Sequence, residues 1–354
     1  MLVLSALAIT LWAYHFTRIE IEFPESHIDG LLVCTPENNV SPGGFSEEEW
    51  ESIGSEFTNA LAESLLESED PEARLLGIQN FSTSNEPLKI TQIAKLASEH
   101  PDNALINLRL LNACTQYTDH PGCSASSIES AHAVNADNAV SWSLLAVYRK
   151  KIQDEFGADR AMLRAASAPK FEDYFGKQVG IMRDAILQGP DYQYWWSTWD
   201  ILARSTLILQ NTHFVSSVCD VSDSLRLSLL EACQQFGERM QAERQSLMAI
   251  AVGGGIQQAA FAAMGNSTEA RRVEREYMTR QSNRSNREST WAEWDRTGSL
   301  MMYDVDLTLY WLDSIVEYGE TETAILRVVE EAKRLSSDPE YKPCRPPRPI
   351  LHYI

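Results

Sequence analysis

The chain has 354 residues, of which 44% are hydrophobic and 23% charged, and this composition of an ordinary globular protein excludes a disordered or fibrous chain. Its formal net charge of -20 argues against unspecific binding to nucleic acid or to an anionic membrane face. The length fits roughly two domains or one elongated array.

The first predicted segment, residues 1–18, begins with an apolar run from Met1 to Phe16. The run is long enough for the core of a signal peptide and shorter than the ~20 residues that comfortably span a bilayer. It lacks the cationic start of a signal peptide, and a buried helix remains an alternative. We expect an export segment or a membrane anchor, which places the protein in the cell envelope with the bulk of the chain outside the cytoplasm.

An acidic linker is predicted next, at residues 19–45. Apolar and acidic residues alternate over Ile19–Phe23, so a half-buried strand is an equal alternative for this part of the linker. Ser46 and Glu49 then form a capping box, because each side chain can accept a hydrogen bond from the backbone amide at the other position. A helix is therefore predicted to run from there to about Leu66.

One sequence pattern occurs twice between residues 100 and 168. It opens with HPDNAL at residues 100–105 and with NADNAV at residues 135–140, a period of 35 residues from Asp102 to Asp137. Repeats of this length stack into helical solenoids. Each Asp-Asn pair can cap a helix start, because its side-chain oxygen can accept a hydrogen bond from an unpaired amide. A third unit is expected to precede the two, beginning at residue 70.

The second copy resembles a degenerate tetratricopeptide repeat. Its large and small residues stand where that motif places them, at Trp142, Leu145, Ala146, Ala158, Met162 and Ala165. Small residues let the two helices of a hairpin approach closely, and large ones fill the groove with the next hairpin. The copy departs from the motif at Arg149, where an aromatic residue is usual, and at Pro169, which comes one residue early.

The resemblance covers roughly residues 70–175, and the chain is also similar to uncharacterised bacterial envelope proteins with a Cys-containing repeat before a long helical tail. It implies an α-solenoid that binds another protein or peptide on its concave side. The first-helix residues that would face this groove are Asn112, Ser143, Lys150 and Lys151. No cofactor is implied.

Beyond the repeats the sequence predicts helices at Phe171–Gln188, Ser197–Thr212, Asp223–Ala263, Ser267–Arg287 and Thr321–Leu335. The aromatic cluster Tyr192–Trp199 fits core packing between helical layers or a stacking platform for a sugar or peptide. Gly253–Gly255 lacks the preceding strand of a phosphate-binding loop, so a turn within a long helix or a close helix contact explains it better. The Pro-rich tail must be extended, and it docks on a partner or lies along its own domain.

Six cysteines predict disulfides in an oxidising compartment. The expected pairs, in order of decreasing strength, are Cys114 with Cys123, Cys219 with Cys233, and Cys34 with Cys344. A zinc site is the alternative for the first pair, because Cys114 and Cys123 lie near His120 and His132, and two thiolates with two imidazoles can hold zinc tetrahedrally.

The sequence contains no nucleophile elbow, phosphate-binding loop or zinc-protease motif. Asp304 and Asp306 point in different directions on a helix, so we expect solvated charges there and not an acid–base pair. The leading function is a non-catalytic adaptor or scaffold of the cell envelope. A motif-less helical enzyme and a purely structural envelope component are the alternatives.

The predicted fold is therefore all-α, a tetratricopeptide-like solenoid of helical hairpins with an N-terminal apolar segment and a C-terminal helical region. Its predicted parts are the apolar segment 1–18, the linker 19–45, the repeat region 46–190, the C-terminal helical region 191–338 and the Pro-rich tail 339–354.

Overall fold

The computed structural model describes residues 28, 30–33, 55, 59–80, 85–188, 215–219, 226–243, 246–286, 288–301 and 303–343. All regular elements in these ranges are helices, which confirms the predicted all-α class. None of the helices described there is long and apolar enough to cross a membrane. The apolar segment 1–18, most of the linker, the aromatic cluster 192–199, Cys34, Cys344 and the tail beyond residue 343 lie outside these ranges.

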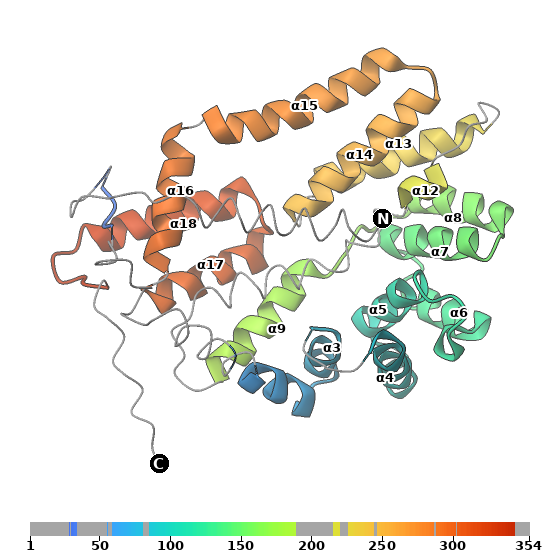
Figure 1. Ribbon diagram of the computed structural model, residues 1–354, viewed down its shortest axis with the longest axis horizontal. Coiled ribbons are helices and arrows are strands. Elements are labelled where there is room, and N and C mark those ends of the chain that lie inside the picture. Colours follow the sequence, from blue (N-terminus) through green and yellow to red (C-terminus); the bar gives the residue numbers. More distant parts are fainter. Residues whose placement is uncertain are drawn as a thin grey trace.

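Consecutive helices pair into hairpins that lie side by side along an arc (Figure 1). The pairs are α3 (Pro71–Asn80) with α4 (Glu86–Glu99), α5 (Ala104–Cys114) with α6 (Ala125–Ala133), α7 (Ala139–Lys151) with α8 (Glu155–Ser167), and α13 (Leu227–Ala242) with α14 (Leu247–Ala263). The short helix α12 (Val215–Cys219) packs against α7, and α13 packs against α8.

The repeated asparagines begin the first helices of two successive hairpins, as predicted. The Asn103 side chain accepts a hydrogen bond from the Ile106 amide at 3.0 Å, and Asn138 accepts one from the Val140 amide at 3.1 Å. Asn135, at the start of the second copy, donates to the Ala104 carbonyl at 2.8 Å. The repeated pattern therefore caps each hairpin and also joins it to the hairpin before it.

Both stronger cysteine pairs form disulfides in the structure, in agreement with the sequence prediction. Cys114 at the end of α5 is bonded to Cys123 in the 3-10 turn before α6, with a Cα–Cα distance of 5.4 Å. Cys219 at the end of α12 is bonded to Cys233 in α13, with a Cα–Cα distance of 6.0 Å. All four residues are buried in the same hydrophobic cluster, so both cross-links belong to the core.

Three hydrophobic clusters meet on α9 (Phe175–Gln188). The first fills the hairpins from α3 to α8 and continues into α12, α13 and α14, so it crosses the predicted boundary near residue 190. The second takes Phe175 and Val179 from α9, and the third takes Met182 and Ala185. The predicted repeat and C-terminal regions therefore share their cores through one helix.

The second cluster is built by the last three helices, α16 (Glu288–Met301), α17 (Val305–Tyr318) and α18 (Glu322–Ser336). The long helix α15 (Ser267–Asn286) connects α14 to α16 along one edge of the molecule (Figure 1). Leu31 joins the same cluster, and the Leu32 amide donates to the Ser336 hydroxyl at 2.9 Å. The N-terminal described residues therefore pack against the C-terminal helices.

The glycine run lies inside α14, where α14 crosses α13. A Cβ atom added to Gly253 would lie 2.6 Å from the carbonyl oxygen of Gly237, so the two backbones are in contact. The expected close helix contact is confirmed. The prediction of a turn at the glycines and of one helix over Asp223–Ala263 is wrong: α13 ends at Ala242, and Ser246 caps α14 by accepting from the Ala249 amide at 3.1 Å.

The glycine contact makes a matched pair of substitutions informative. Gly253→Ala is expected to lower the free energy of unfolding by about 2 kcal/mol or more, because the new methyl group meets backbone that cannot rotate away. Gly255→Ala, two residues on, meets nothing within 4 Å and is expected to raise it by up to about 1 kcal/mol through helix propensity. Urea denaturation measures both values, and equal effects would contradict the close crossing.

Candidate functional site

The segment between α8 and α9 is fastened to the start of α7 by Asn138. A backbone bridge joins Lys170 to Asn138, the Asn138 side chain donates to the Glu172 carbonyl at 2.8 Å, and it accepts from the Glu172 amide at 3.1 Å. The backbone groups of Lys170 and Glu172 therefore form hydrogen bonds with residues 137–139 and not within a helix of their own. The helix predicted from Phe171 therefore begins only at Phe175.

Tyr174 ends this segment in a left-handed backbone conformation, with φ 60°, which is uncommon for a residue with a side chain. Its amide donates to the Glu172 carboxylate at 2.9 Å, and its hydroxyl donates to the Asn135 side chain at 3.2 Å. Burial and nearby acids, Glu172 foremost among them, raise the pKa of the phenol to about 12. Tyr174 therefore stays protonated at neutral pH and acts as a hydrogen-bond donor that fixes the segment.

Arg109 of α5 lies fully buried opposite the start of α9 and donates to the Gln178 side chain. Within the described part of the chain, its Nε and Nη1 atoms make no hydrogen bond. Burial lowers its pKa to about 9, against the opposing influence of the Asp173 carboxylate. Asp173 is also buried, and it caps α9 by accepting from the Phe175 amide at 2.9 Å. Burial raises the pKa of Asp173 to about 6.

Buried opposite charges contribute little net stability, but losing one partner leaves the other uncompensated. Arg109→Met is therefore expected to lower the free energy of unfolding by about 1–3 kcal/mol at pH 7, because it removes the hydrogen bond to Gln178 and a cation that attracts the buried Asp173 carboxylate. The double variant Arg109→Met/Asp173→Asn is expected to recover most of this loss, since asparagine can still cap α9 without a charge. Urea denaturation measures the free energy of unfolding of each variant. If the losses of the two single substitutions simply add in the double variant, the two side chains are not coupled.

Two of the four expected groove residues lie inside the protein. Asn112 is only 6% exposed, and Ser143 is fully buried and donates to the Val140 carbonyl at 2.8 Å, so neither offers a surface to a partner. Of the two lysines, Lys150 forms an ion pair with Glu155 at 3.3 Å, and Lys151 is exposed. At Arg109 of α5, the hydrogen bond to Gln178 also brings α9 against the helices that carry the expected groove.

The zinc alternative is not supported by the positions of its four residues. Cys114 and Cys123 are bonded to each other, while His120 accepts from the Gly122 amide at 3.1 Å and His132 lies 2.9 Å from the Ser141 hydroxyl. Over the ranges that the structure describes, no three metal-ligating side chains come together.

Ser141 and His132 bring a hydroxyl and an imidazole together, as in a nucleophilic dyad. The Ser141 hydroxyl is fully buried, which leaves no room for a substrate. The His132 ring meets Trp142 edge to face, with ring centres 4.1 Å apart. Burial, assisted by the charge of Arg149, lowers the pKa of His132 to about 4. The contact therefore supports a structural role for the pair.

The neutral His132 makes stability depend on pH. The unfolded chain binds a proton here below pH 6.5 and the folded chain only below about 4, so the free energy of unfolding falls as the pH falls between these values. In wild type, this effect should lower the free energy of unfolding by about 1–2 kcal/mol, a value reduced for solvent screening because His132 is partly exposed. His132→Gln should remove this loss. Denaturation at pH 7 and 4.5 checks this, and a constant difference between variant and wild type would contradict it. The raised pKa of Asp173 has the opposite effect, because it stabilises the folded protein as the pH falls. This contribution is the same in the variant and the wild type, so it cancels in the difference between them.

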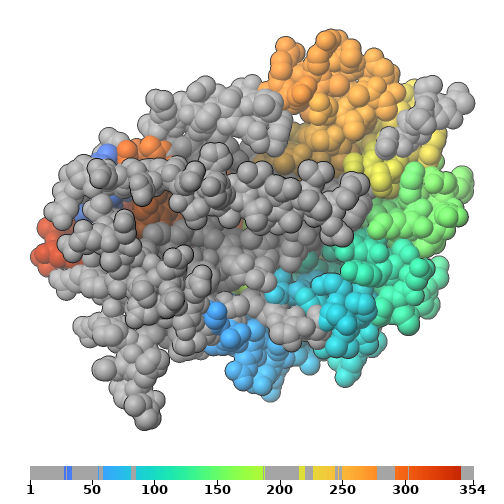
Figure 2. Space-filling model, viewed as in Figure 1, coloured from blue at the N-terminus to red at the C-terminus, as the bar shows by residue number. Residues whose placement is uncertain are grey.

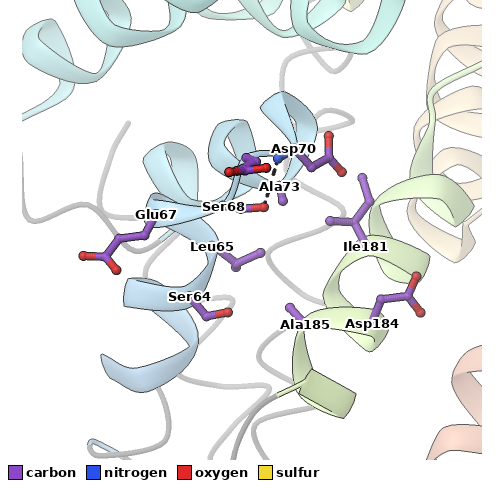
Figure 3. Close-up of a pocket in the computed structure, with 10 residues that line it drawn as sticks. Ser64, Leu65, Glu67, Ser68, Asp70, Ala73, Ile181, Asp184 and Ala185 are labelled. Carbon is purple, nitrogen blue, oxygen red and sulfur yellow. Dashed lines mark hydrogen bonds between the residues drawn. The ribbon is translucent and has the colours of Figure 1, made fainter.

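An open pocket of about 510 Å³ lies between residues 64–73 and α9 (Figure 3). Apolar side chains face each other across it, Leu65 and Ala73 from one side and Ile181 and Ala185 from α9. Two serines and four acidic residues complete the lining, and one of these acids, Asp184, forms an ion pair with the neighbouring Arg183 at 2.6 Å. We name this feature the acidic pocket, and its acids are Glu67, Glu69, Asp70 and Asp184.

The outer side of α8 is the second surface with a distinct chemistry. Phe156 is 73% exposed, Leu163 is 41% exposed, and Ile152 in the preceding turn is 47% exposed. The Arg160 guanidinium lies 5.8 Å from the centre of the Phe156 ring. Spacings of four, seven and eight residues from Phe156 place the helical members of this surface on one side of α8. We name it the α8 face, and it consists of Ile152, Phe156, Arg160, Leu163 and Arg164.

The acids of α8 do not neutralise this face. Glu155 pairs with Lys150, and Asp159 pairs with Arg226 of the loop before α13. Among the described residues, neither Arg160 nor Arg164 has an acidic side chain at ion-pair distance. The hairpin that carries the face lies toward the right-hand end of the molecule in Figure 2. Two cations and three apolar side chains therefore point to solvent from a strongly acidic protein.

Comparison with protein families, with characterised proteins and with solved structures finds no match for the chain.

Proposed function

We propose that the protein is a non-catalytic adaptor or scaffold of the cell envelope that binds another protein through the α8 face. A contiguous apolar and cationic surface on a single helix is what a partner helix or segment would cover. The exposure of Phe156 carries this proposal, because aromatic residues are enriched in the buried centres of interfaces and a 73% exposed one has no role in the core.

Two further observations support the setting. The hairpins and their 35-residue period are consistent with a degenerate tetratricopeptide-like solenoid, a fold that serves as a binding scaffold. Two buried disulfides are typical of proteins in oxidising compartments. We therefore place the bulk of the chain outside the cytoplasm, with residues 1–18 as its anchor or export segment.

The binding site differs from the concave groove that the repeats suggest. Asn112 and Ser143 are buried, and α9 contacts the inner side of α5 through Gln178. Lys151, which adjoins the α8 face in sequence, is the expected groove residue that remains exposed. Binding through an outer face keeps the core intact.

Cross-linking in intact envelopes tests the proposal. Phe156→Ser combined with Leu163→Ser should reduce the yield of the cross-linked partner at least tenfold, because it removes apolar area from the contact while leaving helicity unchanged. Leu326→Ser on α18 is the matched control, since this leucine is 39% exposed and lies outside the face.

Mass spectrometry identifies the partner, and circular dichroism checks the fold of each variant. An unchanged yield with the α8 variant would refute the proposal. If trimming the Pro-rich tail from Pro343 onward abolishes the yield instead, the tail is the binding element.

A further inference from the structure

The α8 face and the acidic pocket have complementary chemistry. The face presents the aromatic ring of Phe156 beside the guanidinium groups of Arg160 and Arg164. The pocket presents an apolar floor with the acids Glu67, Glu69 and Asp70 on one side, while the fourth acid, Asp184 of α9, is paired with the neighbouring Arg183 at 2.6 Å. An aromatic side chain fits a concave apolar floor, and guanidinium groups form strong hydrogen bonds with carboxylates.

One molecule does not bring the two surfaces together. The α7–α8 hairpin, which carries the α8 face, lies apart from α3 and from the C-terminal half of α9, which supply residues to the lining of the pocket (Figure 1). Each molecule therefore offers one cationic face and one acidic pocket, both open to solvent. A second copy of the chain carries the chemistry that each of them lacks.

We propose that copies of this chain associate head to tail, with Phe156 of one molecule seated in the acidic pocket of the next and with Arg160 and Arg164 facing its carboxylates. This inference rests on the proposed function of the α8 face and names its partner. A contact between two different surfaces is heterologous, so it repeats from copy to copy and builds a ring or an open chain. The protein then acts as a self-assembling scaffold.

The net charge sets the conditions for this association. Two molecules of charge -20 repel each other over long distances. At physiological ionic strength the screening length is about 8 Å, so groups in direct contact dominate. The face and the pocket are small, so we expect association in the micromolar range or weaker.

Two variants that each remove one surface test the contact. Phe156→Ser/Arg160→Ser alters the α8 face, and Glu67→Lys/Glu69→Lys alters the pocket rim, where both glutamates are exposed. Sedimentation of the full chain at physiological ionic strength, from micromolar to near-millimolar concentration, should show growing oligomers for wild type. Each variant alone should stay monomeric, with at least a tenfold loss of affinity.

An equimolar mixture of the two variants gives the decisive signature. The mixture retains one intact face and one intact pocket, so it should form one-to-one dimers that grow no further, a result that misfolded variants cannot give. Leu326→Ser/Arg327→Ser on α18 is the matched control and should assemble like wild type.

A wild-type chain that stays monomeric overturns the inference, and so do variants that assemble normally or a mixture that stays monomeric. If self-association fails while the α8 variant still loses its cross-linked partner in envelopes, the proposed function stands and its partner is a different protein. If both effects are absent, the proposed function fails as well.

Discussion

The packing of α9 is the constraint that links the three hydrophobic clusters, and a buried hydrogen bond from Arg109 of α5 to Gln178 ties α9 to the hairpins. Arg109 is fully buried on α5, a helix of the first hydrophobic cluster, whereas α9 supplies Phe175 and Val179 to the second. A charged side chain that needs specific acceptors tolerates fewer arrangements than an apolar one would. On its other side, α9 approaches α17 so closely that a Cβ atom on Gly176 would lie 3.2 Å from the Val316 carbonyl oxygen. The helix is thereby fixed from both directions.

This arrangement has a consequence for binding. A helical array usually offers its inner side to a partner, but here that side is joined to α9 by the Arg109 contact and by the ion pair of Lys177 with Glu72, whose atoms lie 2.6 Å apart. A partner on the inner side would have to displace a helix that three clusters share. A partner that binds an outer surface does not have to displace α9. For this reason the function that we propose rests on the α8 face and the acidic pocket.

Local sequence signals predicted the helices, the Asn103 and Asn138 caps and two disulfides, because each depends on residues close together in the chain. The start of α9 and the burial of Arg109 depend on contacts between distant residues, and no local pattern encodes them. Arg109 stands inside an apolar run, which was a usable sign of burial. Asp304 was expected to be solvated, yet it caps α17 by accepting from the Leu307 amide at 3.0 Å and accepts from the Tyr341 hydroxyl.

The α8 face also escaped prediction, and the reason is electrostatic. Along the sequence, the acids Glu155 and Asp159 stand just before Arg160 and Arg164, so the segment has the mixed charge of an ordinary solvated helix. In three dimensions Asp159 turns to Arg226, which is 67 residues away and reaches α8 only because α13 packs on it. Stacking the fourth hairpin therefore removes acids from the outer side of α8 and leaves its arginines beside Phe156. The same packing that completes the core creates the cationic surface, so a net charge of -20 says nothing about the sign of the surface that a partner meets.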